Sequence, residues 1–215
     1  MPPIVLVHGG LWEPMDATQF WHRPGIVPAL AAAGYDVVAP DRPINPPSWD
    51  AELAALAGHM PRRPALLVTA SNACALAVGL ARAHPVAGLI LAWPATAGDP
   101  AIDEALRARL IGEGASPDDV AAVLAGETLR GTSDVELAGS AVPVGVVSSD
   151  PPNRVHQRRT VDALLRVVPG AIELLSCPEP PRPEFTTADP LDAGASSHRD
   201  RFVAALRAFA DRLAP

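Results

Sequence analysis

The stretch that decides the fold is LLVTASNACALAVGL, residues 66–80. It begins with an apolar run typical of a buried strand, passes through small and polar residues, and ends in an alanine-rich segment typical of a helix. Ser71 lies at the corner between strand and helix. A serine in that place either caps the helix through its hydroxyl or stands exposed on a sharp turn as a nucleophile.

Short apolar runs recur along the chain and alternate with helical patterns. This alternation predicts βαβ units around a mostly parallel sheet. The runs are too continuously apolar for a half-exposed sheet, so we expect helices on both faces. The predicted strands are residues 4–7, 36–39, 65–69, 88–92, 145–148 and 172–175. The predicted helices are residues 25–33, 48–58, 72–83, 155–168 and 197–213.

Residues 99–140 interrupt this alternation. They contain helical patterns at 102–112 and 117–124 but no convincing strand. Long excursions of this kind are often caps or lids over a site. The alternative is a surface insertion of helices without a role in function. We expect one domain over residues 1–215, with residues 99–140 as a helical cap.

Composition limits the classes of function. The chain has 215 residues, 48% of them hydrophobic and 19% charged, which suits one globular domain. A net charge of −7, spread along the chain, argues against nucleic acid as a partner. The apolar runs are too short for a signal peptide or a membrane span, so we expect a cytoplasmic protein with no membrane partner. The bias towards Ala, Arg and Pro, with no lysine, suggests a GC-rich bacterial genome.

Neither a metal site nor a cofactor is expected. The two cysteines, Cys74 and Cys177, do not make a disulfide framework or a zinc site. The sequence contains no glycine-rich phosphate loop and no set of His and Asp residues with metal-ligand spacing. The chemistry must therefore come from ordinary side chains.

Two motifs resemble those of the α/β-hydrolase family. Residues 69–73, Thr-Ala-Ser-Asn-Ala, resemble the family's Gly-x-Ser-x-Gly nucleophile elbow, with Thr69 and Ala73 at the two glycine places. Residues 4–12, IVLVHGGLW, resemble the strand and His-Gly turn that supply the second oxyanion donor. The resemblance implies a three-layer sandwich around a mostly parallel sheet. The antiparallel strands that often precede this first strand look absent.

The resemblance also implies an oxyanion hole and a catalytic order. The donors would be the backbone N–H groups of Gly10 (or Leu11) and Asn72, whereas the His8 side chain would be structural. The family's order is nucleophile, acid, histidine, and Ser71, Asp150 and His198 follow it.

The acid has more than one candidate. Asp150 comes directly after the strand at 145–148 and is the residue we expect. A second alignment puts Asn153 in the acid position, where an amide could orient an imidazole but not offset its charge. Asp189 and Asp192 precede His198 and are further candidates. His156 is expected only to open the helix at 155–168.

The expected function is a serine hydrolase that cleaves a carboxylic ester or thioester through an acyl-enzyme on Ser71. Its partner would be a small-molecule acyl substrate, and the oligomeric state is not predicted. Leu11, Trp12 and Trp93 follow strand ends and could line an apolar pocket, although the tryptophans could equally be core residues. Two other functions stay open: a natural-product tailoring enzyme (cyclase, lyase or acyltransferase) and a catalytically silent binding protein.

Overall fold

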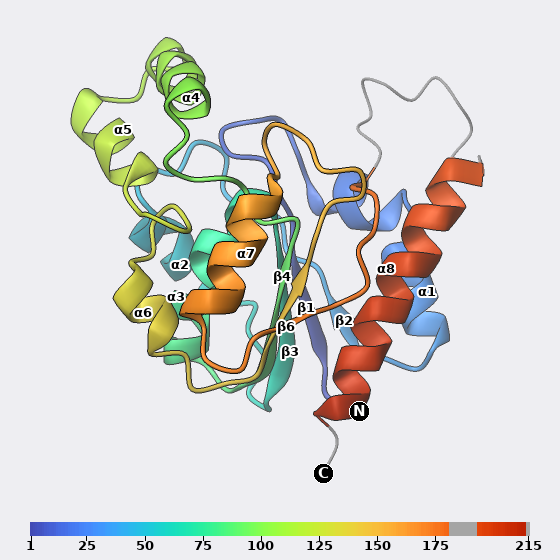
Figure 1. Ribbon diagram of the computed structural model, residues 1–215. Helices are drawn as coiled ribbons and strands as arrows, with labels where there is room; N and C mark the ends of the chain where they lie inside the picture. Colours follow the sequence, from blue (N-terminus) through green and yellow to red (C-terminus); the bar gives the residue numbers. More distant parts are fainter. Residues whose placement is uncertain (181–192, 214–215) are drawn as a thin grey trace.

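A six-stranded sheet lies between two layers of helices in the computed structural model, which describes residues 1–180 and 193–213 (Figure 1). The strand order is β2-β1-β3-β4-β5-β6, and each strand of the sheet is parallel to its neighbours. The strands are β1 (Ile4–Val7), β2 (Val37–Val38), β3 (Ala65–Ala70), β4 (Val86–Ala92), β5 (Val144–Val147) and β6 (Ile172–Glu173). The predicted fold class is confirmed.

The two edge strands are shorter than the sequence predicts. β2 pairs only with β1, and β6 pairs only with β5. A strand with one neighbour is held on one side alone, so fewer of its residues join the ladder. In the centre, β3 continues to Ala70, one residue further than predicted, and ends directly at Ser71.

Helices cover both faces, as the continuously apolar strands predict (Figure 1). On one face lie α1 (Ile26–Ala32) and α8 (Ala193–Arg212); on the other lie α2 (Trp49–Ala57), α3 (Ala77–Ala83) and α7 (Arg158–Val167). There are also two short helices, a π-helix η1 (Thr18–His22) and a 3-10 helix η2 (Ser71–Leu76). None of the helices described is both long and apolar enough to cross a membrane.

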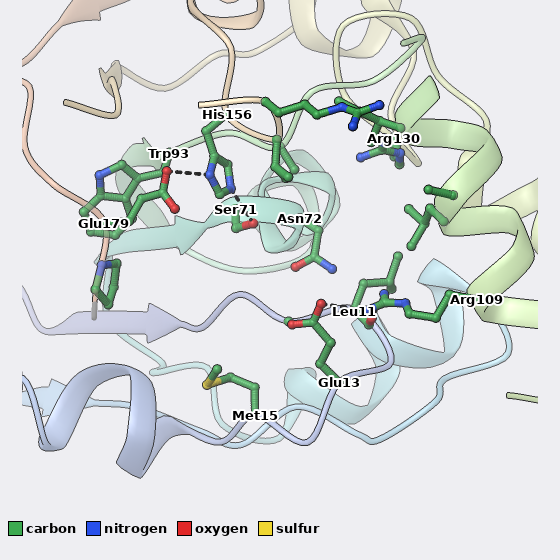
Figure 2. A pocket seen from close by; sticks show the side chains of 18 of the residues that line it. Leu11, Glu13, Met15, Ser71, Asn72, Trp93, Arg109, Arg130, His156 and Glu179 are labelled. Carbon is green, nitrogen blue, oxygen red and sulfur yellow. Dashed lines mark hydrogen bonds and ion pairs between the residues drawn. The ribbon is translucent and has the colours of Figure 1, made fainter. Parts of the chain in front are cut away.

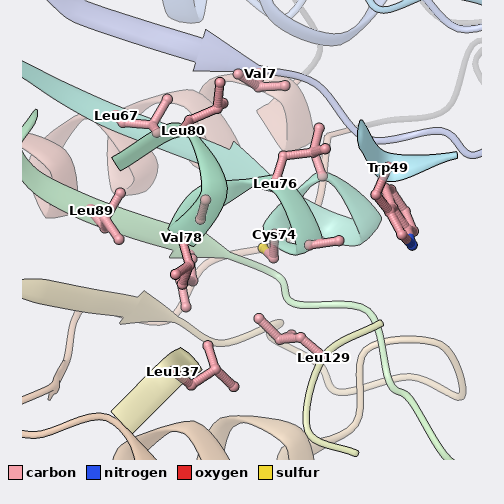
Figure 3. Close-up of a cluster of buried hydrophobic side chains, with 14 of the residues drawn as sticks. Val7, Trp49, Leu67, Cys74, Leu76, Val78, Leu80, Leu89, Leu129 and Leu137 are labelled. Carbon is pink, nitrogen blue, oxygen red and sulfur yellow. The ribbon is translucent and has the colours of Figure 1, made fainter. Parts of the chain in front are cut away.

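Each face of the sheet has its own hydrophobic core. Leu67 of β3 packs with Leu76 and Leu80 on one face (Figure 3), whereas its neighbours Leu66 and Val68 belong to the core on the other face. Successive strand side chains point to opposite faces, so a strand buried on both sides must be apolar at every position. This packing fixes where β3 ends and therefore where Ser71 lies.

Residues 99–140 form three helices between β4 and β5. They are α4 (Pro100–Gly112), α5 (Pro117–Leu124) and α6 (Asp134–Ala138). Asp99 and Ser116 cap the first two by accepting backbone N–H groups of the first turn. Figure 1 shows α4 and α5 projecting from one end of the molecule, away from the chain termini. As expected, no strand of the sheet comes from this segment.

Candidate active site

Ser71 stands on a strained turn between β3 and η2. Its φ is +54°, in the left-handed region that residues other than glycine seldom occupy. The space for this turn comes from Gly9 on the neighbouring loop, where an added Cβ would lie 2.9 Å from the Cβ of Ser71. Thr69 is accommodated because its buried hydroxyl donates to the Ile90 carbonyl of β4, 3.5 Å away. The turn therefore has the geometry of a nucleophile elbow without glycines at positions 69 and 73.

A chain of two hydrogen bonds joins Ser71 to a histidine and a carboxylate (Figure 2). The Oγ atom of Ser71 lies 2.9 Å from Nε2 of His156. On the other side of the ring, Nδ1 of His156 lies 2.6 Å from Oε1 of Glu179. His156 lies in the loop between β5 and α7, and Glu179 follows β6. Three loops at the carboxyl ends of β3, β5 and β6 therefore meet at one place.

The environment of Glu179 sets the direction of these hydrogen bonds. Burial by itself raises the pKa of Glu179, but hydrogen bonds from His156, Ser149 and Asn153 outweigh it and lower the pKa. The side chain is therefore an ionised carboxylate at neutral pH and can only accept. His156 consequently donates from Nδ1, and Nε2 is the ring nitrogen that faces the hydroxyl of Ser71.

His198 does not approach Ser71, and its expected role as the base is wrong. It lies in α8 with 1% of its surface exposed, beside the stacked rings of Trp93 and Phe202. Its Nδ1 donates to the carbonyl oxygen of Pro178 over 2.6 Å. Burial lowers the pKa of His198, so the ring is neutral. The last helix, α8, begins before His198, and the packing of this helix buries the histidine in the core.

The two candidates for the acid after β5 are also wrong. Asp150 forms an ion pair with Arg201, at 2.8 Å, and does not contact a histidine. Asn153 accepts the backbone N–H of His156 at 3.0 Å through Oδ1 and donates to Glu179 through Nδ2. Asn153 therefore links the backbone of His156 to the Glu179 carboxylate, and Glu179, not Asn153, contacts the His156 ring. Asp189 and Asp192 lie outside the described residues.

Three side-chain donors hold the segment that leads to Glu179. Arg201 donates to the carbonyl of Ser176 (2.5 Å), Trp93 to that of Cys177 (3.0 Å) and His198 to that of Pro178 (2.6 Å). Carbonyl oxygens of three consecutive residues are thus fixed by β4 and α8. Glu179 comes next in the chain. The hydrogen bonds to the three preceding carbonyl oxygens therefore help to hold the Glu179 carboxylate towards His156.

The turn after β1 borders the same pocket as Ser71. Gly10 and Leu11 line the pocket beside Ser71 and Asn72. Gly10 has a φ of +94°, and a Cβ there would lie 2.7 Å from Met15. Among the described residues, neither Gly10 nor Leu11 has a hydrogen-bond acceptor for its backbone N–H. These amides are therefore available to a bound oxygen.

A buried ion pair is hydrogen-bonded to the backbone of this turn. Arg42 pairs through Nε with Glu52, and the two side chains are 3% and 0% exposed. Its Nη1 donates to the carbonyl oxygens of His8 (2.8 Å) and Gly10 (3.3 Å) and to Oδ1 of Asn72 (3.0 Å). One guanidinium therefore links both residues expected to supply oxyanion donors.

His8 is structural in its contacts. Its Nδ1 donates to the carbonyl of Gly9, 2.6 Å away, and its Nε2 accepts the backbone N–H of Arg42 at 3.1 Å. Burial lowers the pKa of His8 to about 4, so the ring is neutral at physiological pH. A neutral ring with both nitrogens occupied has no proton to exchange with a substrate.

A pocket of about 420 Å³ opens in front of Ser71 and His156. Leu11 and Trp93 line it as expected, together with residues of α4. Trp12 does not line it: the Trp12 indole donates to the Pro46 carbonyl, so that expectation is wrong. The apolar lining residues are Leu11, Met15, Phe20, Trp93, Ala95, Ala101, Ile102, Ala105, Leu106, Val155 and Pro180. The part of the chain that the structure describes holds no cluster of three or more metal-ligating side chains.

The structure was compared with known proteins. No protein-family model and no curated protein matches the chain. Solved structures do match it over 99% of its length. A thermophilic esterase from Thermogutta terrifontis has 19% identity and a TM-score of 0.64, with 90% of that chain covered. NosK from Streptomyces actuosus has 18% identity and a TM-score of 0.65, with 98% covered.

A third structure extends this result. The esterase RhEst1 from Rhodococcus sp. ECU1013 has 19% identity and a TM-score of 0.61, and the match covers 99% of this chain and 91% of that one. Identities this low carry information about the fold rather than about the chemistry. The matches span nearly the full length of each chain and agree with the mostly parallel sheet flanked by helices. This chain therefore has the α/β-hydrolase fold.

Proposed function

We propose that this protein is a serine hydrolase that cleaves a carboxylic ester or thioester through an acyl-enzyme on Ser71. His156 is the general base and acid, and Glu179 orients it. The observation that carries the proposal is the hydrogen-bond chain from Ser71 through His156 to Glu179, with atom separations of 2.9 and 2.6 Å. A serine hydroxyl is a poor nucleophile until a base takes its proton, and this arrangement provides the base.

The reaction would proceed in two halves. His156 removes the hydroxyl proton of Ser71 as Oγ attacks the substrate carbonyl carbon, and the adjacent Glu179 carboxylate stabilises the imidazolium. The tetrahedral intermediate collapses, the carbonyl carbon loses its bond to the leaving oxygen or sulfur, and His156 protonates that leaving group. Water, deprotonated by His156, then attacks the acyl-enzyme and releases the acid with Ser71 restored.

The oxyanion of the tetrahedral intermediate would be held by backbone amides. The N–H of Asn72 and that of Gly10 or Leu11 are the candidates, because these residues line the pocket beside Ser71. Removing a single donor from such a site raises the barrier by about 3 kcal/mol. The largely apolar pocket suits an acyl group with hydrocarbon character. Among the similar structures, two are esterases and one is a thioesterase domain from the curacin pathway, which supports both kinds of leaving group.

A fluorophosphonate probe tests the proposal. Wild-type protein should be labelled at Ser71 and should hydrolyse p-nitrophenyl butyrate, whereas Ser71→Ala should do neither. Ser140→Ala, a serine away from the pocket, is the matched control and should behave as wild type. Folded wild-type protein that is neither labelled nor active on oxygen esters or thioesters would instead favour a silent binding protein.

A further inference from the structure

The pocket has a basic end as well as the proposed catalytic residues. Three arginines line it, each from a separate segment: Arg109 from α4, Arg130 from the connection between α5 and α6, and Arg154 from the connection between β5 and α7, two residues before His156. Figure 2 shows Arg109 and Arg130 across the pocket from His156 and Glu179. A molecule whose carbonyl reaches Ser71 can therefore extend towards these guanidinium groups.

Arg130 is the most buried of the three, and the protein uses little of its hydrogen-bonding capacity. Its side chain is 4% exposed, and Nη2 pairs with Asp103 over 2.8 Å. Its Nε is buried and has no hydrogen-bond partner among the described residues. A guanidinium carries five N–H donors, and a buried one gains from a second acceptor that carries negative charge. Arg130 is therefore suited to bind an anion.

Arg154 and Arg109 differ in how they are paired. The Arg109 guanidinium is committed to the first loop, through Glu13 at 2.6 Å and the Leu11 carbonyl. Arg154 has an exposed side chain, and no carboxylate pairs with it within residues 1–180 and 193–213. An anionic ligand could therefore pair with the Arg154 guanidinium without displacing a carboxylate of the described residues.

The charge at this end of the pocket is positive. The arginines of the lining, Arg109, Arg130 and Arg154, outnumber its two carboxylates, Glu13 and Glu179, by one, and Asp103 pairs with Arg130 from outside the lining. The chain as a whole carries a net charge of −7 and repels anions. A local excess of positive charge in a concave site concentrates the field and attracts an anionic group against that background.

We propose that the substrate ester carries a carboxylate, bound at the basic end of the pocket by Arg130 and Arg154. This inference rests on the proposed hydrolase function and specifies its substrate class. The carboxylate belongs either to the acyl group or to the leaving group, and both share the same recognition chemistry. If the arginines serve only to hold the segment 99–140 against the first loop, the charge of the substrate will have no effect.

Matched esters that differ only in charge test the proposal. One pair places the charge on the acyl group: p-nitrophenyl hydrogen glutarate and p-nitrophenyl glutaramate. The other places it on the leaving group: the butyrate esters of p-hydroxybenzoate and p-hydroxybenzamide. After correction for spontaneous hydrolysis, kcat/KM should favour the carboxylate over its amide by about tenfold in one of the two pairs. Raising the salt concentration should weaken that preference.

Single substitutions identify which arginines cause the preference for the carboxylate ester. Arg154→Gln and Arg130→Gln should each bring the carboxylate-to-amide ratio towards one. Arg107→Gln is the matched control: Arg107 is exposed on α4, does not line the pocket, and its substitution removes the same charge. It should leave the ratio and the activity unchanged. Equal rates for the carboxylate and amide in both pairs, or a preference that survives both Arg154→Gln and Arg130→Gln, would overturn the proposal.

Binding without turnover separates this inference from the proposed function. In Ser71→Ala, the carboxylate ester of the preferred pair should raise the melting temperature more than its amide does. Esters that bind with this preference but are not hydrolysed by wild-type protein would refute the hydrolase and retain the anion site. Hydrolysis of carboxylates and amides alike would refute the anion site alone.

Discussion

Nδ1 of His156 lies 2.6 Å from Oε1 of Glu179, and the histidine comes first in the chain. In the proposed mechanism the base therefore follows β5 and the acid follows β6, the reverse of the nucleophile, acid, histidine order that the family resemblance implies. Both loops leave the sheet at the same edge, because β5 and β6 are parallel, so either can bring a side chain to Ser71.

Replacement of the base should abolish turnover. For His156→Ala we expect kcat on p-nitrophenyl butyrate to fall by about 10⁴-fold, because Ser71 loses its proton acceptor. His59→Ala, on the exposed surface, is the control and should retain full activity. An active His156→Ala protein would exclude this histidine as the base.

Substitution of His198 should affect activity through the position of Glu179. His198→Asn keeps a donor near the Nδ1 position, whereas His198→Phe keeps a ring beside Trp93 and Phe202 but loses the hydrogen bond to Pro178. We expect His198→Phe to lower kcat by up to about a hundredfold with KM unchanged, and His198→Asn to recover most of that loss. If both variants are as inactive as His156→Ala, His198 takes part in the chemistry directly.

The two candidate acids can be separated by matched amides. Glu179→Gln removes the charge that stabilises the imidazolium and should lower kcat by about 10⁴-fold. Asp150→Asn breaks an ion pair with Arg201 whose side chains are 35% and 47% exposed, so its effect on turnover should be small. Steady-state kinetics on one ester suffices, and a larger loss in Asp150→Asn than in Glu179→Gln would restore the expectation from sequence.

The buried Arg42–Glu52 pair should affect stability and activity separately. Arg42→Met leaves the Glu52 carboxylate buried and unpaired, which should reduce the free energy of unfolding by about 3–5 kcal/mol. The double variant Arg42→Met, Glu52→Met removes both charges and should recover most of that stability in urea unfolding.

Activity should not return with stability in that double variant, because Gly10 and Asn72 have still lost their common donor. We expect kcat to stay low while the melting temperature recovers. Full recovery of both quantities would mean that the pair supports the fold alone and does not position the oxyanion donors.

His8 should make the protein labile to acid. Its pKa is about 4 in the folded state and 6.5 as the ordinary value, so the unfolded chain binds the proton more readily. The stabilisation by neutral His8 is complete above pH 6.5 and is lost as the pH falls towards 4, a change of about 3 kcal/mol. Burial lowers the pKa of His198 as well, and its effect has the same sign.

Urea unfolding across this pH range measures the effect. Wild-type protein should lose stability as the pH falls through this window, and His8→Gln should lose less because the titrating group is gone. His59→Gln, with an exposed side chain, controls for the removal of a histidine and should follow the wild-type curve. Parallel curves for His8→Gln and wild type would contradict the assignment.

The sequence by itself determined the fold and the position of the proposed nucleophile. Apolar runs buried on both sides require helices on both faces, and this pattern placed all six strands within a few residues of their observed bounds. The small residues around Ser71 and the His-Gly turn after β1 are local features, so the elbow and the adjacent turn could be found without coordinates. The helical pattern of residues 99–140 is likewise a local feature of the sequence.

Only the tertiary structure decided which histidine and which carboxylate reach Ser71. The chain offers a histidine and an acid after each of the last two strands, and nothing local distinguishes Asp150 with His198 from His156 with Glu179. The choice follows from packing: α8 buries His198 beside the rings of Trp93 and Phe202, and Asp150 pairs with Arg201. Contacts between segments far apart in sequence settle it, because a hydrogen-bonded triad is defined by distances in space and not by order along the chain.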